Sequence, residues 1–359
     1  MKKRNKRLDV LRIIAASLVF LYHWSGNGPR GFYSELPNKF PILNIPNWAA
    51  PITKTGFIGV DIFFLLSGVV IASSAINSNV KDFAKSRFLR LYPTYLIANL
   101  LAITIVPIVK PNISRSHLLF SLTGLHFFAG GEQVIGALWT LQQEVFFYSI
   151  VAMSITILSK GKTFDEIALK KVLTIWTIII VYIPVLQLKS LNNFIPGYCS
   201  YFIIGSLISI TRNKKELKNN LILICVSSSL AIRQIGGRME NAVNLPHAQL
   251  IGISILLVTI LYLFLANRNQ MGGRIGKNRK YLTLIANATY PFYLLHETIG
   301  ETFIQILWRH GVSINTSYLL VFLGIIALSI FITWKIEPLI KKLLSCFFLN
   351  SSSSNAASQ

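Results

Sequence analysis

The segment LDVLRIIAASLVFLYHW, residues 8–24, places an arginine and a histidine in an otherwise apolar stretch. Arg12 and His23 are eleven residues apart, and eleven helical steps of about 100° return to nearly the same face after a rise of about 16 Å. Placing such a charged side chain in hydrocarbon costs at least about 2.5 kcal/mol, so it usually faces a bundle interior and marks function. The segment therefore predicts a membrane helix with a functional polar face.

The rest of the chain repeats this apolar character. Of its 359 residues, 53% are hydrophobic and 13% are charged, a balance that soluble domains rarely show. Apolar segments long enough to cross a hydrocarbon core of about 30 Å recur along the chain. They are residues 8–25, 56–76, 88–109, 135–158, 172–188, 195–210, 221–235, 250–266, 282–307 and 318–336. The sequence predicts an all-α, polytopic membrane bundle of about ten transmembrane helices.

The basic residues are distributed unevenly between the two sides of this predicted bundle. The formal net charge is +22, which by itself would also suit a nucleic-acid partner. However, 25 of the 35 lysines and arginines fall on the side of the N-terminus, 9 fall on the other side, and Arg12 lies within a span. Because cytoplasmic loops carry excess positive charge, this pattern predicts that both termini are cytoplasmic and that the lipid bilayer, rather than nucleic acid, is the partner.

The domain organisation is expected to be simple. Residues 1–342 form one predicted transmembrane domain, and the polar residues 343–359 form a tail that we expect to be disordered. The basic N-terminus followed by an apolar run imitates a signal peptide, but no small-residue cleavage site follows, so the first span is expected to be retained. Cys199, Cys225 and Cys346 are scattered, which predicts neither a disulfide framework nor a metal site.

Further ionisable residues fall within the apolar segments. Asp61 (in GVDIFFLLSG), Glu144 (in LWTLQQEVFFY) and His296 (in YPFYLLHE) are expected in the middle or outer half of the membrane, and Arg87 and Arg90 near the inner surface. Arginine suits phosphate because its planar fork stays charged, and histidine suits proton transfer because its ordinary pKa lies near neutrality. The arrangement favours a reaction between an anionic donor inside and an acceptor outside.

Structural interpretations of the same residues remain open. Arg87 and Arg90 also fit ordinary interfacial anchors, Arg12 also fits a pair with Asp9, and His23 beside Trp24 also fits an interfacial position. Asp61 and Glu144 could instead pair with neighbouring helices, and His296 fits a structural role equally well. A transporter, or a glycan flippase or polymerase, would also contain intramembrane charges. The glycine-rich loop MGGRIGKNRK, residues 271–280, fits either a phosphate cradle or an ordinary basic loop.

Six segments, taken in order, resemble the membrane acyltransferase family 3, which includes O-acetyltransferases of bacterial surface polysaccharides. They are the R-x10-H pattern of Arg12 and His23, GVDIFFLLSGVVIA, RFLRLYP, LWTLQQEVFFY, YPFYLLH, and the IEP segment with Glu337 and Pro338. The resemblance covers nearly the whole chain. It implies transfer of an acyl group, commonly acetyl from acetyl-CoA, to a hydroxyl of a glycan or a lipid-linked sugar.

The resemblance also implies roles for particular residues. His23 corresponds to the essential histidine, Arg12 to its partner in the pattern, and Glu144 to the glutamate of its segment. We expect Arg12, Arg87 and Arg90 to bind the donor phosphates, His23 to act as the base, and Asp61 or Glu144 to orient the imidazole or the acceptor. A covalent acyl-histidine is an alternative route. The expected location is a bacterial inner membrane, where the chain is a monomer or a homo-oligomer.

Overall fold

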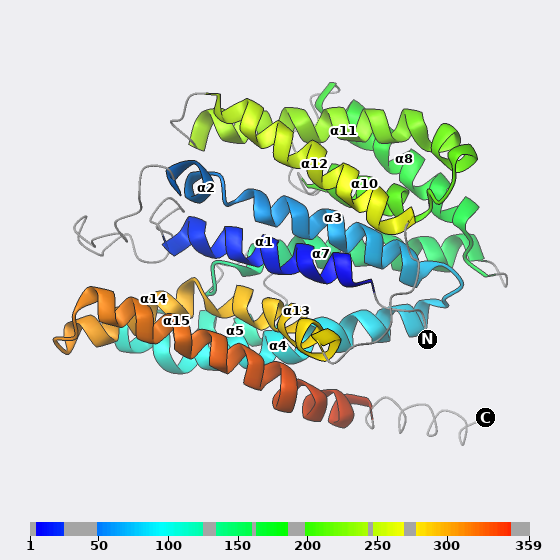
Figure 1. Cartoon of the computed structure of the whole chain (residues 1–359). Helices are drawn as coiled ribbons and strands as arrows, with labels where there is room; N and C mark the ends of the chain where they lie inside the picture. The colour runs from blue at the N-terminus through cyan, green and yellow to red at the C-terminus, as the bar shows by residue number, and fades with distance from the viewer. Residues whose placement is uncertain are drawn as a thin grey trace, which may run out of the picture. The chain divides into compact units, whose positions relative to one another are not determined.

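The computed structural model describes residues 5–24, 49–124, 134–159, 163–185, 198–242, 247–268 and 278–345. Within these ranges the chain is helical and contains no strand (Figure 1). The elements are α1 (Lys6–Trp24), α2 (Ala50–Lys54), α3 (Ile58–Ala75), α4 (Val80–Val109), α5 (Arg115–Thr123), α7 (Leu138–Ser159), α8 (Glu166–Val185), α10 (Cys199–Ser209), α11 (Lys214–Ala242), α12 (Ala248–Arg268), α13 (Asn278–Leu295), α14 (Thr298–Arg309), α15 (Ile314–Phe331) and the π-helix η2 (Ile332–Ile336).

The chain divides into two compact units. Unit 1 contains α1, α2, α3, α8, α10, α11, α12 and nearly all of α7. Unit 2 contains α5, α14, α15, η2 and most of α4 and α13. Each unit draws on segments that are far apart in the sequence, so neither corresponds to a continuous half of the chain.

Helix α3 forms the core of unit 1 together with α10. All residues of α10 are buried, as are most residues of α3. The two helices cross at glycines: a Cβ atom on Gly68 would lie 2.3 Å from the Phe202 carbonyl oxygen, and one on Gly205 would lie 2.0 Å from the Leu65 carbonyl oxygen. Small residues allow helix backbones to approach closely in membrane bundles, where van der Waals contact rather than the hydrophobic effect drives association.

This close crossing makes Gly205 sensitive to any side chain. We expect Gly205→Ala to destabilise unit 1 by about 1–3 kcal/mol, because the added methyl group must push the α3 backbone away. Gly236→Ala is the matched control, since a Cβ atom there meets nothing within 4 Å, and alanine is the better helix former. The control should leave the melting temperature unchanged or slightly higher.

The buried thiol of Cys199 supplies the measurement, because it is 1% exposed in the folded protein. In a Cys225→Ser, Cys346→Ser background, the temperature at which Cys199 reacts with a maleimide dye reports the loss of unit 1 packing. A Gly205→Ala midpoint equal to that of the Gly236→Ala control would contradict the proposed close crossing.

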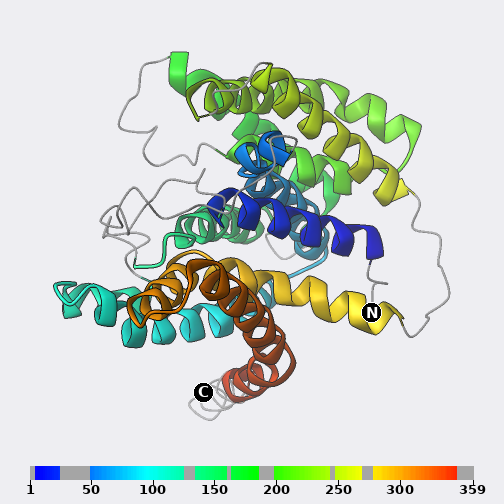
Figure 2. The same cartoon turned by 60° about the vertical axis from the view of Figure 1, so that its left-hand side comes forward.

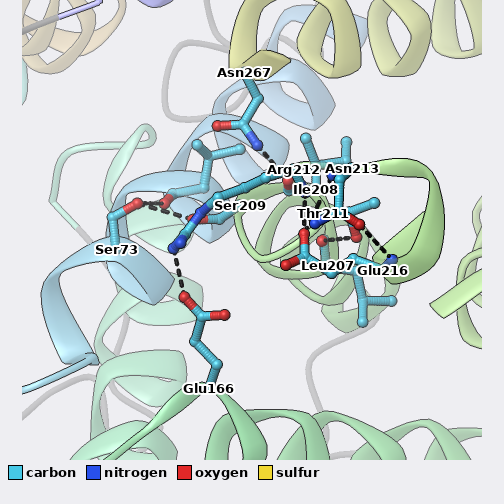
Figure 3. Close-up of polar contacts among 11 residues, drawn as sticks. Ser73, Glu166, Leu207, Ile208, Ser209, Thr211, Arg212, Asn213, Glu216 and Asn267 are labelled. Carbon is cyan, nitrogen blue, oxygen red and sulfur yellow. Dashed lines mark hydrogen bonds and ion pairs between the residues drawn. The ribbon is translucent and has the colours of Figure 1, made fainter. Parts of the chain in front are cut away.

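The C-terminal end of α10 is tied to its neighbours by hydrogen bonds (Figure 3). The Ser209 and Ser73 hydroxyls lie 2.8 Å apart, which joins α10 to the end of α3. Asn267 Nδ2 donates to the Ile208 carbonyl oxygen at 2.7 Å, which joins α10 to the end of α12. These bonds satisfy polar groups at a helix end, where backbone carbonyls lack partners within the helix.

The start of α11 lies at the same end of unit 1 (Figure 3). Asn213 Oδ1 accepts from the Glu216 backbone N–H at 2.9 Å, and Glu216 Oε2 accepts from the Asn213 backbone N–H at 3.2 Å. This reciprocal pair is a capping box, which fixes where α11 begins. The Arg212 guanidinium forms an ion pair with Glu166 at the start of α8. The starts of α8 and α11 and the end of α10 therefore meet at one end of unit 1.

In unit 2, α14 and α15 form a helical hairpin (Figure 2). Gly311 adopts a positive φ of 84° between the two helices, a conformation that glycine adopts without strain. The Ser313 hydroxyl then accepts from the Thr316 backbone N–H at 3.2 Å and caps α15. Helix α15 continues through the π-helix η2 into residues 337–345.

The predicted spans agree with the structure in type but not everywhere in extent. Among the described residues, six helices are long and apolar enough to cross a membrane, so the predicted count of ten is not confirmed. They are Ile58–Ala75, Val80–Val109, Leu138–Ser159, Lys214–Met239, Gln249–Asn267 and Ile314–Ser345. The cytoplasmic position of both termini stays a prediction, and the polar tail lies outside the described residues from residue 346 onward.

Two predicted spans differ from the observed helices in an informative way. The predicted span 282–307 is divided, because α13 ends at Leu295 and α14 begins at Thr298. His296 and Glu297 form the turn between them. The predicted span 195–210 contains α10, which has 11 residues and is therefore only about 16 Å long. It fills the interior of unit 1 instead of crossing a full hydrocarbon core.

Candidate active site

Arg12 and His23 lie on the buried stripe of α1. Between them, at helical spacing, Ala15 is 0% exposed and Val19 is 1% exposed. Arg12 and His23 are themselves half-buried. The stripe therefore continues from the arginine to the histidine on the side of α1 that packs inside unit 1, which is the placement that a functional polar face requires.

The buried stripe of α1 packs against α3 in antiparallel orientation. A Cβ atom on Gly59 would lie 2.3 Å from the Ala15 carbonyl oxygen, and one on Gly56 would lie 2.2 Å from the Leu18 carbonyl oxygen. Moving from Gly56 to Gly59 along α3 therefore corresponds to moving back from Leu18 to Ala15 along α1, so the two helices run in opposite directions. Extending this register places His23 level with the residues before α3 and places Arg12 about 16 Å further along α1, level with the beginning of α3.

Arg12 is paired with an acidic residue of its own helix. Its Nη1 donates to Asp9 Oδ1 at 2.9 Å, and the Asp9 and Arg12 side chains are 2% and 17% exposed. The alternative in which Arg12 pairs with Asp9 is therefore confirmed. The pair does not remove Arg12 from consideration, because a guanidinium carries five N–H donors.

Glu144 bridges α7 to α3. Its Oε1 accepts a hydrogen bond from the Ser67 hydroxyl, and its Oε2 accepts from the Tyr148 hydroxyl at 3.2 Å. The α1–α3 register places Ser67 about level with Arg7, which is about 24 Å of helix rise from His23. In the described part of the chain, Glu144 makes no hydrogen bond to His23. The structure therefore places Glu144 toward the Arg12 end of α1 and separates it from the imidazole.

Asp61 forms an ion pair that sequence reasoning missed. Its Oδ2 lies 2.7 Å from Arg238 Nη2, and the Asp61 side chain is 0% exposed. The same Nη2 donates to the Tyr201 hydroxyl at 3.0 Å, while the guanidinium carbon lies 5.3 Å from the Phe57 ring centroid and 5.1 Å from that of Tyr198. A buried carboxylate thus has a cation partner that is itself covered by aromatic rings.

Arg238 was missed because α11 is longer than the predicted span. The predicted span 221–235 ends before Arg238, so the sequence places this residue in an outer segment. The helix instead continues to Ala242. Asp61 itself indicated that such a partner exists, because a carboxylate buried near the end of a span requires a cation at a similar depth.

Ring contacts connect this ion pair to the histidine end of α1. The Phe57 and Tyr22 rings are 5.5 Å apart, and the Tyr22 and His23 rings are 5.4 Å apart. Phe57 also lies beneath the Arg238 guanidinium. His23 and the Asp61–Arg238 pair therefore belong to one aromatic-lined region of unit 1.

The basic pair of α4 lies in unit 2. Arg87 and Arg90 are half-buried, and their spacing of three, with Thr94 four residues further, places all three on one face of α4. Thr94, which is 1% exposed, donates from Oγ1 to Glu337 Oε1 at 2.6 Å. This hydrogen bond joins the residue directly after the RFLRLYP segment to the IEP segment. The sequence alone did not indicate that these segments are close together.

His296 occupies the break between α13 and α14. It is 1% exposed, and its Nδ1 lies 2.7 Å from the Tyr293 carbonyl oxygen, which therefore accepts the imidazole hydrogen. Next to it, the Glu297 carboxylate lies against Gly136, where a Cβ atom would be 2.6 Å from Oε1. The Gly136 backbone N–H donates to the Thr298 hydroxyl at 2.9 Å. Glu297 and Thr298 were not predicted, because their partner lies about 160 residues earlier in the chain.

One predicted feature cannot be placed. The glycine-rich loop falls mostly outside the described residues, which resume at residue 278.

These observations define a polytopic helical membrane protein whose units contain buried basic, acidic and imidazole side chains. A family model described as an acyltransferase domain matches residues 5–336. The chain belongs to acyltransferase family 3, and it is therefore a membrane acyltransferase. Comparisons with curated proteins and with solved structures gave no match.

Proposed function

We propose that the chain transfers an acyl group, in the simplest case acetyl, from cytoplasmic acyl-CoA to a hydroxyl of a cell-surface or lipid-linked glycan. Its membership of an acyltransferase family supports the transfer itself. The observation that carries the proposal is the placement of Arg12 and His23 on the buried stripe of α1. A cation and an imidazole at two depths suit an anionic donor from one side and an acceptor on the other.

In the proposed step, the acceptor hydroxyl oxygen attacks the thioester carbonyl carbon of the donor. An imidazole nitrogen of His23 takes the hydroxyl proton as the new C–O bond forms. The C–S bond breaks, the CoA thiolate leaves, and the imidazolium returns the proton to sulfur. In the alternative route, the imidazole nitrogen first attacks the thioester carbon, the C–S bond breaks, and CoA leaves as the thiol after taking the imidazole proton. The acceptor oxygen then attacks the acyl carbon, the C–N bond breaks, and the hydroxyl proton returns to the imidazole.

The remaining predicted residues receive roles that agree with their contacts. Arg87 and Arg90 bind donor phosphates, since both are half-buried on one face of α4. Glu144 acts toward the Arg12 end of α1, which its hydrogen bond to Ser67 supports. Asp61 holds Arg238 beside the aromatic rings at the His23 end of α1. The membrane is taken to be a bacterial inner membrane, with the acceptor on its outer side.

The mass of surface glycans tests this function directly. Cells that make the chain, fed acetate carrying a heavy isotope, should yield glycan repeat units that are heavier by one labelled acetyl group. Cells without the chain should yield unmodified units. Identical glycan masses in both cultures, under conditions where the chain is present in the membrane, would exclude the proposed acceptor class.

A further inference from the structure

One carboxylate in unit 2 joins a threonine of α4 to a lysine beyond η2. Glu337 accepts from the Thr94 hydroxyl through Oε1 and from Lys341 Nζ through Oε2, each at 2.6 Å. Thr94 is 1% exposed and Glu337 is 8% exposed, whereas the Lys341 side chain is 38% exposed. Glu337 therefore fixes the position of the Lys341 ammonium group, while part of the lysine side chain stays accessible.

The lysine lies on the same side of this contact as the basic pair of α4. Arg90 precedes Thr94 by one helical turn, and Lys341 follows Glu337 by one turn. Helices α4 and α15 run in opposite directions in unit 2 (Figures 1 and 2). Arg90 and Lys341 are therefore displaced in the same direction from the Thr94–Glu337 bond, each by about 6 Å. Arg87 follows on the same face of α4, about one turn further.

The π-helix η2 lies directly before Glu337 and determines where Glu337 and Lys341 point. A π turn contains one more residue than an α turn, so it rotates the residues that follow by about 100° relative to a regular helix. Lys335, within the turn, lies over the Trp334 ring at 4.2 Å. Lys341, after the turn, instead bonds to the carboxylate that contacts α4. Such turns occur frequently at functional sites.

We propose that Lys341 is a further phosphate-binding residue of the donor site, oriented by Glu337 and Thr94. The inference rests on the proposed function, in which Arg87 and Arg90 bind the phosphates of acyl-CoA. An ammonium group has three N–H donors, and the bond to Glu337 uses one of them. The other donors suit phosphate oxygens, and two helices then supply cations to the several phosphate groups of one ligand.

The competing interpretation is that Lys341 is an ordinary interfacial lysine that forms a helical i, i+4 pair with Glu337. Lys342 distinguishes the two interpretations. It carries the same charge at the neighbouring position and is exposed, but it points about 100° away around the helix. An interfacial role treats the two lysines alike, whereas a phosphate-binding role depends on Lys341 alone.

The test measures binding of CoA and of S-acetylpantetheine, which lacks phosphate, to the purified full chain in lipid nanodiscs. We expect Lys341→Met to raise the Kd for CoA about tenfold, the loss expected for one partly exposed hydrogen bond between charged groups. Binding of S-acetylpantetheine should not change. Lys342→Met should stay within about twofold of the unmodified chain, and Lys341→Arg should retain most of the affinity because it keeps the charge.

Further variants separate this inference from the proposed function. Equal CoA affinity for Lys341→Met and Lys342→Met overturns the inference alone, provided that Arg87→Ala weakens binding. If Lys341→Met weakens CoA binding but Arg87→Ala does not, phosphate binding by Lys341 is supported and phosphate binding by Arg87 is rejected. An unmodified chain that does not bind CoA overturns both. A melting temperature equal to that of the unmodified chain shows that each variant is folded.

Discussion

His23→Ala should lower the rate of acyl transfer about 10²–10⁴-fold, because that is the usual contribution of a positioned general base. The measurement uses the purified chain in nanodiscs, isotope-labelled acetyl-CoA and glycan isolated from cells that lack the chain. The stability should change little, because His23 is only half-buried at the end of the α1 stripe. A variant that is folded and transfers acetyl at the normal rate would remove the histidine from the mechanism.

Two controls separate a chemical role from a structural one. His310→Ala removes an exposed imidazole from the α14–α15 turn, and it should leave the rate unchanged. Added imidazole should restore part of the activity of His23→Ala, because the truncation leaves a space of the same shape beside Tyr22. A packing defect would not respond to the added base.

The same variants distinguish direct transfer from the covalent route. With acetyl-CoA but no acceptor, the covalent route accumulates an acetyl group on His23, which peptide mass spectrometry detects. Direct transfer leaves the histidine unmodified under these conditions. A labelled His23 peptide that loses its label when glycan is added would establish the covalent intermediate.

The helical character of the chain follows from its hydropathy, but helix ends do not. The apolar segment 56–76 and helix α3, Ile58–Ala75, nearly coincide, because the whole segment is apolar and α3 is mostly buried. The predicted span 282–307 is broken at His296 and Glu297, since averaging over a window conceals two adjacent polar residues. Helix α11 passes through Gly236 and ends at Ala242, because glycine in a helix interior costs only about 1 kcal/mol relative to alanine.

Contacts within one helix could be predicted from the sequence, whereas contacts between helices could not. The Arg12–Asp9 pair follows from a spacing of three residues. The partners in Asp61–Arg238 are 177 residues apart, and those in Ser67–Glu144 are 77 apart. Hydropathy shows that such residues need partners, but only packing selects which ones. The sequence predicts that Glu144 or Asp61 orients the imidazole or the acceptor, whereas the structure places Glu144 toward the Arg12 end of α1, away from the imidazole.

Breaking the Asp61–Arg238 pair should destabilise unit 1 strongly. Removing one partner of a buried ion pair typically costs about 3–5 kcal/mol, because the other charge stays buried without compensation. Arg238→Leu should cost more than Asp61→Leu, since the Asp61 side chain is 0% exposed and that of Arg238 is 25% exposed. The guanidinium also keeps its contact with the Tyr201 hydroxyl. The midpoint of Cys199 labelling measures both effects.

The double variant Asp61→Leu, Arg238→Leu should recover much of this stability, because replacing a buried ion pair by apolar side chains is often neutral. Its coupling energy, from the double-mutant cycle, isolates the pair from the separate effects of each truncation. If the loss of stability in the double variant equals the sum of the losses in the two single variants, the two side chains do not interact directly.

The double variant also tests the predicted catalytic role of Asp61, because it removes the carboxylate without leaving a buried charge unpaired. If the folded double variant transfers acetyl at a normal rate, the carboxylate serves only to hold Arg238. If it is folded but inactive, the pair also acts on the reaction, and its ring contacts through Phe57 and Tyr22 provide the route to His23.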